Sequence, residues 1–367
     1  MVTNIYFSKK QIIGFKGAEP DLNVRLDVIL KYINDSDLKI KLITPTPATE
    51  NQLLLAHNDL YLNELKNPAR LNKYFPDEPL TKGTFTVLKL SAGSAIDACE
   101  YSFKKKKFSF ALTRPKGNFA GHDFFGNFSY INNMAVAVLN LLDKNPNLKV
   151  LIFDFDAHFC KGTNDIFKEN PNVYIVSIHQ FAETIFPYTG KEKDSTKHLK
   201  LIENRLWIND DEFLDNVRNK ALPYIEEVKP DIICVSAGFN LYFKDIFYGT
   251  TSNIRLPSTF KTLAKMLNTK AREIDAPIFA ILEGGYWTED LGELVYNFLK
   301  GFDDSFNKKL PDVISDGSPN KRKTTVKKKK IVKKVDKKKT KTKKGEKNVI
   351  LKKSKTGTRK KTNKKRK

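Results

Sequence analysis

The chain has 367 residues, 40% of them hydrophobic, and a formal net charge of +23. This length and apolar content exclude a small disulfide-stabilised protein or a wholly disordered one, because the chain can bury a substantial core. They suit one large α/β domain or two smaller domains. Residues 317–367 hold 26 Lys and Arg against two acidic residues, whereas residues 1–316 hold 39 basic and 40 acidic residues, so the basic character belongs to the C-terminal segment.

Short apolar runs rich in β-branched and aromatic residues alternate with longer helical patterns along the chain. The runs predict strands at residues 4–8, 39–44, 108–113, 150–154, 173–178, 232–236 and 277–282. The helical patterns lie at residues 24–33, 84–103, 132–142, 211–228, 258–274 and 290–301. Runs such as "VLIFDFD" are apolar on both faces, as strands covered by helices on both sides are. We predict a three-layer α/β/α body with a mainly parallel central sheet over residues 1–302.

Polar residues follow four of the predicted strands. They lie in "TRPKGNFAGHDFFGNFSYINN" (residues 113–133), "FDFDAHFCKGT" (153–163), "VSAGFN" (235–240) and "LEGGYW" (282–287). Ligand sites of parallel sheets lie at the carboxyl ends of the strands, so we expect these loops to share one site. Asp154, Asp156 and His158, spaced two apart, look like metal ligands, yet the next polar residue, Lys161, is a cation.

Seven segments in order carry a family resemblance. "EPDLNVRLDVIL" is similar to H-P-E-x-P-E-R-L, "AHNDLYLNEL" to V-H-x-x-x-Y-L, and "SAGSAIDA" to A-A-G-G-x-x-x-A. "RPKGNFAGHD" resembles R-P-P-G-H-H-A-G-x-D, "INNMAVAV" resembles F-N-N-x-A-I-A-A, and "SAGFN" and "LEGGYW" resemble S-A-G-F-D and L-E-G-G-Y-D. Over nearly all of residues 1–302 the chain therefore resembles the histone deacetylase and acetylpolyamine amidohydrolase family, which has the arginase–deacetylase fold.

The resemblance implies zinc-assisted hydrolysis of an acyl amide, such as acetyl-lysine or an acetylated polyamine. In the family, two aspartates and a histidine hold zinc, two histidines move protons, and a tyrosine hydroxyl stabilises the oxyanion. Carried onto this sequence, the resemblance makes Asp156 and His158 two of the zinc ligands and places Tyr286 at the oxyanion position.

The other positions of the implied site depart from the family pattern. The third zinc ligand is replaced by Asn240, whose neutral amide is a poorer ligand than a carboxylate. Asn118 and Phe119 replace the two proton-transferring histidines, and neither is a general base. Lys161 stands where the family has an acid that orients the second histidine. We expect the exchanges at Asn240 and Lys161 to add about two positive charges to the pocket and to weaken zinc binding.

Four further residues have a role that the sequence leaves open. Asp154 and Ser177 match residues that hold a monovalent cation such as potassium in the family, but Asp154 could equally support loop geometry alone. His122 lies in a site loop and could replace a lost base in part. Cys160 has no neighbouring base in the sequence, which favours a small buried side chain over a nucleophile.

Residues 317–367 form a low-complexity, Lys-rich tail, and residues 303–316 are its predicted linker. The tail has no periodic apolar face, so we expect it to remain disordered. Such tails bind DNA, RNA or chromatin by neutralising phosphates, although a solubilising role or contact with an acidic protein or membrane surface is the alternative. The tail has no aromatic residue to stack on bases. The clustered cations predicted to bind nucleic acid are Lys321, Arg322, Lys323, Lys327, Lys328, Lys329, Lys330, Lys364, Lys365 and Arg366.

Cysteine usage and the N-terminal sequence limit the compartment. Three scattered cysteines fit neither a disulfide framework nor a Cys-based zinc site, which favours a reducing environment. "MVTNIYFSKKQIIGF" lacks the apolar core of a signal peptide, and no run of about 18 apolar residues occurs. We expect a soluble intracellular protein without a membrane span, in the cytoplasm and nucleoid or in the nucleus.

Two functional hypotheses follow. In the first, the chain is a pseudo-deacetylase with a degenerate zinc site, tethered to nucleic acid or chromatin by its tail. In the second, it is an active but divergent zinc-dependent deacetylase that uses Asp156, His158, Asn240 and Tyr286, with water or His122 relaying protons.

Overall fold

The structure, a computed structural model, describes residues 2–13, 23–67, 80–81 and 83–303. The predicted tail, the predicted linker beyond Asp303 and the start of the family resemblance at residue 19 lie outside the described residues. No helix of the described part is long and apolar enough to cross a membrane.

The centre of the fold is an eight-stranded sheet in which all neighbouring strands are parallel. The strands are β1 (Thr3–Tyr6), β2 (Ile40–Ile43), β3 (Ser109–Ala111), β4 (Val150–Asp154), β5 (Val173–Gln180), β6 (Leu199–Asn204), β7 (Ile232–Ala237) and β8 (Ile278–Leu282), in the order β2-β1-β3-β8-β7-β4-β5-β6. All seven predicted strands are confirmed. The eighth, the edge strand β6, was missed because Lys200 and Glu203 interrupt its short apolar pattern.

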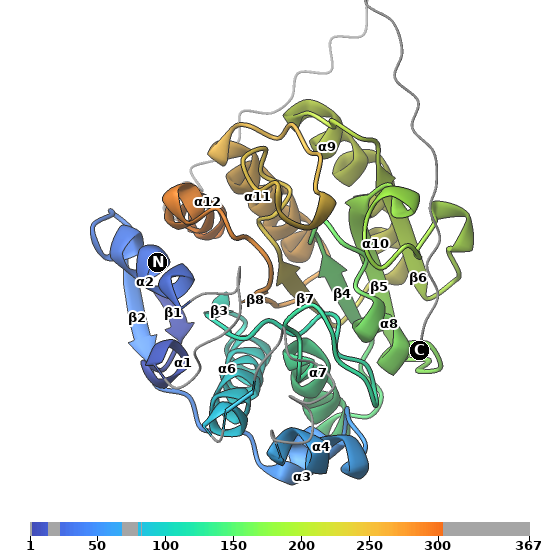
Figure 1. Ribbon diagram of the computed structural model, residues 1–367. Helices are drawn as coiled ribbons and strands as arrows, with labels where there is room; N and C mark the ends of the chain where they lie inside the picture. Colours follow the sequence, from blue (N-terminus) through green and yellow to red (C-terminus); the bar gives the residue numbers. More distant parts are fainter. Residues whose placement is uncertain (1, 14–22, 68–79, 82, 304–367) are drawn as a thin grey trace, which may run out of the picture. The chain divides into compact units, whose positions relative to one another are not determined.

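Helices cover both faces of this sheet (Figure 1). They are α1 (Lys10–Ile13), α2 (Val24–Asn34), α3 (Glu50–Leu54), α4 (Asp59–Lys66), α6 (Thr84–Lys105), α7 (Asn133–Lys144), α8 (Lys161–Phe167), α9 (Asp210–Asn216), α10 (Leu222–Val228), α11 (Pro257–Glu273) and α12 (Thr288–Gly301). A π-helical turn, Val217–Ala221, joins α9 to α10, so the predicted helix at 211–228 is confirmed as one continuous helical segment.

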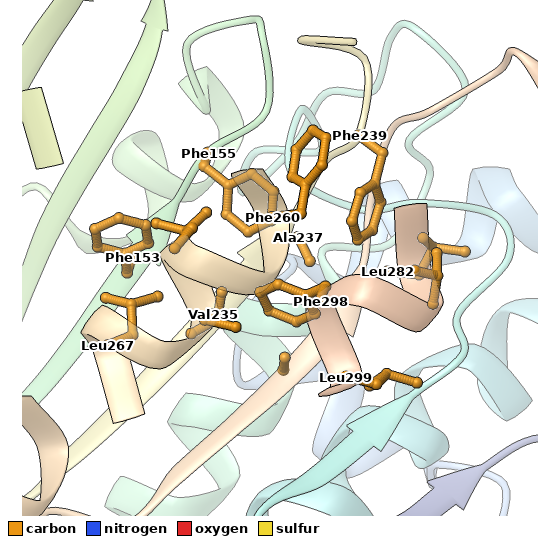
Figure 2. Close-up of a cluster of buried hydrophobic side chains, with 14 of the residues drawn as sticks. Phe153, Phe155, Val235, Ala237, Phe239, Phe260, Leu267, Leu282, Phe298 and Leu299 are labelled. Atoms are coloured by element: carbon orange, nitrogen blue, oxygen red, sulfur yellow. The ribbon is translucent and has the colours of Figure 1, made fainter. Parts of the chain in front are cut away.

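The alternation of side chains along β4 divides the core into two layers. Leu151 and Phe153 pack into the cluster formed with α2, α9, α10, α11 and α12, whereas Val150 and Ile152 pack into the cluster formed with α3, α4, α6 and α7. Figure 2 shows the first cluster, in which Phe155 lies against aromatic rings from α11 and α12. The predicted three-layer α/β/α architecture is therefore confirmed.

Candidate active site

The loops that follow β3, β8, β7 and β4 meet at one end of the sheet, because these four strands are neighbours. The Asn240 amide nitrogen lies 2.8 Å from Asp156 Oδ1, so the loops after β7 and β4 are in contact. The Gly117 backbone amide donates to Glu283 Oε2 at 2.8 Å, which joins the loops after β3 and β8. Gly284 donates to Asp156 Oδ2 at 3.1 Å, and a Cβ there would lie 2.5 Å from that oxygen, so only glycine fits.

The orientation of the Asn240 amide is set by one backbone contact. The Ala157 backbone N–H donates to Asn240 Oδ1 at 2.8 Å. Since a backbone N–H can only donate, the amide oxygen must face Ala157, and the NH₂ group must face the site. This NH₂ group donates to Asp156 Oδ1 and lies 3.2 Å from His158 Nδ1. A hydrogen-bond donor therefore occupies the place of the third predicted ligand.

Asn118 and Phe119 are both buried in the loop after β3. The Phe119 ring packs edge-on against His158, with 5.8 Å between ring centroids, and against Phe186 at 5.3 Å. The Asn118 backbone N–H donates to Glu283 Oε2 at 3.3 Å. The side chain of Asn118 is a neutral amide, which is not a general base. The place predicted for proton-transferring histidines is thus occupied by an apolar ring and a neutral amide.

Tyr286 is held from two sides. Its backbone N–H donates to Asp245 Oδ2, which also accepts from the Trp287 N–H. The Arg25 guanidinium lies 4.7 Å from the Tyr286 ring centroid, and Arg25 Nε donates to the Gly285 carbonyl at 2.7 Å. Burial raises the pKa of Asp245 to about 6, although these backbone hydrogen bonds oppose the rise. Tyr286 was predicted from the sequence, whereas Arg25 and Asp245, which position it, were not.

Asp154 and Ser177, the predicted monovalent-cation residues, are register partners on β4 and β5. Asp154 Oδ1 accepts from the Asp156 backbone N–H at 2.9 Å, and Ser177 Oγ lies 3.0 Å from His179 Nδ1. Burial, then the charges of Asp156 and Glu283, raises the pKa of Asp154 well above its ordinary value. A cation bound here would reduce the repulsion between these carboxylates. The monovalent-cation site remains a prediction.

His122 and Cys160 both lie in site loops, but His122 is exposed whereas Cys160 is buried. The His122 side chain is exposed, its Nδ1 lies 3.2 Å from the Ala56 carbonyl oxygen, and its backbone N–H donates to Asp165. Cys160 is buried, and burial raises the pKa of its thiol well above the ordinary value. The burial agrees with the small buried side chain that the sequence favoured.

The sequence profile described as the histone deacetylase domain matches residues 19–302. The chain belongs to the histone deacetylase family. It is 31% identical over 295 residues to a probable deacetylase of Methanothermobacter thermautotrophicus, covering 76% of this chain and 84% of that protein. It is 30% identical to acetylpolyamine amidohydrolase 1 of Pseudomonas aeruginosa, covering 62% of this chain and 65% of that protein. The crystal structure of the HDA15 HD domain has the same fold, with a TM-score of 0.73 and 23% identity over 82% of this chain and 90% of that one.

Zinc, which the histone deacetylase family implies, does not fit the donors of this chain. Asp156 Oδ1 already accepts hydrogen bonds from the His158 backbone, from His158 Nδ1 at 3.0 Å and from Asn240. Asn240 presents N–H groups, which have no lone pair to offer a metal. In the described part of the chain, no group of three or more His, Cys, Asp and Glu side chains is placed to hold a metal ion. The three side chains bind one another directly.

Two lysines of the site loops differ in burial in this histone deacetylase family member. The Lys161 side chain is exposed, and its ammonium lies 5.7 Å from the Phe124 ring centroid, outside the buried cluster. Lys116, by contrast, is fully buried, and its ammonium lies 4.0 Å from the Phe119 ring centroid. The signal for Lys116 was present in the sequence, because the family pattern R-P-P-G has proline where "RPKG" has lysine.

Glu283 is a second buried residue whose role was not predicted from the sequence. Its Oε2 accepts from the backbone N–H groups of Gly117 and Asn118, and its Oε1 lies 3.5 Å from Ser236 Oγ. Burial raises the pKa of Glu283 to about 7, while those hydrogen bonds and the charge of Lys116 lower it. Glu283 therefore holds the loop after β3 against the loop after β8.

Proposed function

We propose that this histone deacetylase family protein has lost zinc-dependent hydrolysis and retains the fold as a binding or scaffold module. The observation that carries the proposal is the direction of the Asn240 amide, whose oxygen is engaged by Ala157 and whose NH₂ group donates to Asp156. Restoring a ligand at this position requires a different side chain, since rotating the amide would leave the Ala157 N–H unsatisfied in a buried site.

The groups that move protons support the same proposal. Hydrolysis of an amide needs a base to take a proton from water and an acid to protonate the leaving amine. Phe119 offers no exchangeable proton, and the neutral Asn118 amide does not titrate near neutral pH. Tyr286 alone retains its family identity among the residues that would contact the reacting carbonyl, and an oxyanion donor without a base or metal gives little turnover.

An active, divergent zinc-dependent deacetylase is the second candidate. The likeness to a probable deacetylase and to an acetylpolyamine amidohydrolase favours it, as does the presence of Asp156, His158 and Tyr286. On either candidate the ligands to test are acetyl-lysine peptides and acetylated polyamines. In the active case, Asn240 would have to serve as the third ligand through its amide oxygen.

We further propose that residues 317–367 tether the protein to DNA, RNA or chromatin inside the cell, in the cytoplasm and nucleoid or in the nucleus. The support is charge placement: the tail carries 26 basic residues against two acidic ones, whereas residues 1–316 are close to neutral. Lys-rich segments bind phosphate backbones by releasing counterions, with little dependence on sequence.

A hydrolysis assay tests the loss of activity. We expect the wild-type protein to release no acetate from acetyl-lysine peptides or acetylated polyamines, with zinc or with a chelator. The combined variant Lys116→Met, Asn118→His, Phe119→His, Lys161→Asp, Asn240→Asp should gain at least about 100-fold in zinc-dependent hydrolysis, because general acid–base groups contribute about that much. Each single reversion should do little, since the groups act as a unit.

The same assay separates the two candidates. Robust hydrolysis by the wild-type protein that a chelator abolishes would support the divergent deacetylase and end the pseudo-deacetylase proposal. The matched control is Tyr286→Phe in the combined variant, which should remove the gained activity if the gain uses the oxyanion position. Circular dichroism of each variant checks that the fold is kept.

A further inference from the structure

Lys116 is a fully buried lysine at the centre of the candidate active site. No part of its side chain is exposed, and its ammonium lies 4.0 Å from the Phe119 ring centroid. Lysine is almost never buried to this extent unless its charge is compensated. The same Phe119 ring packs edge-on against His158, which in turn contacts Asp156 Oδ1 at 3.0 Å. Glu283 accepts from the backbone N–H groups of the two residues that follow Lys116, so two buried carboxylates from different loops lie around this lysine.

These carboxylates need a positive charge close by. Asp156 and Glu283 are both fully buried. A charge taken out of water is costly unless an opposite charge or several hydrogen bonds replace the water. A divalent metal supplies that charge in a metal centre, and here the buried Lys116 ammonium contacts the Phe119 ring that packs against His158.

We propose that the Lys116 ammonium is the built-in counter-cation of this site and that, together with the Asn240 amide, it takes the place of a metal ion. The inference deepens the proposed loss of zinc hydrolysis and rests on it. It has a specific consequence: restoring the third carboxylate with Asn240→Asp does not by itself restore metal binding, because the ammonium still repels a divalent cation. The exposed Lys161 has no such effect.

Zinc titration by calorimetry tests this consequence on four full-length proteins. We expect no zinc binding to the wild type and weak binding to Asn240→Asp. The double variant Lys116→Met, Asn240→Asp should bind zinc at least about 100-fold more tightly than Asn240→Asp, because a unit charge beside a divalent ion in a buried site changes affinity by that much or more. The matched control Lys161→Met, Asn240→Asp should bind zinc within about threefold of Asn240→Asp, since exposed charges interact weakly.

A stability cycle tests the counter-cation without any metal. Methionine keeps the length of lysine and removes its charge, so Lys116→Met should lower the urea midpoint at pH 8. Glu283→Gln should raise that midpoint more in the Lys116→Met background than in the wild type. Without the Lys116 ammonium, the buried Glu283 carboxylate has lost its compensating charge, and the glutamine exchange removes that uncompensated carboxylate. If Lys116→Met does not fold, Lys116→Arg, which keeps the charge, should fold with a midpoint close to that of the wild type.

The outcomes separate this inference from the proposed function. Equal zinc affinity of Asn240→Asp with and without Lys116→Met would overturn the proposal that Lys116 is the counter-cation. Additive effects of Lys116→Met and Glu283→Gln on stability would also overturn it. Both results would leave the proposed loss of hydrolysis standing if the wild type is inactive. Tight zinc binding together with hydrolysis by the wild type would overturn the proposed function itself. Non-additive stability with a zinc gain specific to Lys116→Met supports both.

Discussion

Asn240 shows how one contact decides the chemistry of a site. A carboxylate at this position has two equivalent oxygens, so one could accept from the Ala157 N–H while the other faced a metal ion. An amide has only one oxygen, and Ala157 engages it at 2.8 Å. The single exchange of oxygen for NH₂ therefore converts the remaining end of the side chain from a ligand into a donor to Asp156.

Glu283 gives a prediction at the same scale, from the sign of its pKa shift. Burial raises its pKa from the ordinary value of 4.5 to about 7. Between these values the folded protein binds a proton that the unfolded chain releases, so the free energy of unfolding falls as the pH rises from about 4.5 to 7. In Glu283→Gln the amide oxygen can still accept from Gly117, and the amide NH₂ group can donate to Ser236. Because glutamine does not titrate, the variant should not lose stability between about pH 4.5 and 7.

Urea denaturation at pH 5 and pH 8 measures the effect. We expect Glu283→Gln to be more stable than the wild type by about 2–3 kcal/mol at pH 8 and to differ by less than about 1 kcal/mol at pH 5. The exposed Glu289 on α12 provides the control Glu289→Gln, which lacks the buried contacts. A difference that is the same at both pH values would contradict the assignment to a buried carboxyl group.

At the scale of elements, α2 and α12 approach each other at Gly292. A Cβ on Gly292 would lie 2.8 Å from the Val28 carbonyl oxygen and 2.6 Å from Tyr32 Cβ, so the two helices would have to move apart. These helices matter for the site because α2 carries Arg25, which packs over the ring of Tyr286 just before α12.

Gly292→Ala should therefore lower the free energy of unfolding by about 1–3 kcal/mol, the usual cost of overpacking, even though alanine is the better helix former. Thermal and urea denaturation measure the change. Gly126→Ala is the matched control, because a Cβ at Gly126 would meet nothing within 4 Å. A Gly292→Ala protein as stable as the Gly126→Ala protein would show that the helices separate at little cost.

At the scale of the whole molecule, charge separates residues 1–316 from the tail. A protein that ends at Asp316 should lose essentially all affinity for duplex DNA and RNA, whereas the peptide 317–367 should keep most of it. If about 6–10 phosphates are neutralised, log affinity should fall against log salt with a slope of about −5 to −9. Fluorescence anisotropy over a salt series measures both quantities. If the shortened protein binds DNA or RNA as tightly as the full chain, or if the affinity does not depend on salt, the proposed tethering by the tail is wrong.

Much of the architecture was predictable from sequence because it depends on local patterns. Apolar runs with β-branched residues predicted seven of the strands of the sheet, and the two-sided apolar character of β4 predicted helices on both faces. The edge strand β6 was missed because Lys200 and Glu203 interrupt its short apolar pattern, and an edge strand tolerates such charges on its exposed face. Seven motifs in order predicted the family, since each motif is contiguous.

The sequence alone determined which residue types stand at each position of the site, including the exchanges at Asn118, Phe119 and Asn240. Only the tertiary structure decided what these side chains do, because the direction of a side chain and its partners depend on segments far away in the chain. From the sequence we expected added positive charge from the exchanges at both Asn240 and Lys161, yet the Lys161 side chain reaches solvent, whereas Lys116 is fully buried. Solvation decides which of two lysines acts on a buried carboxylate, and solvation follows from packing rather than from position in a motif.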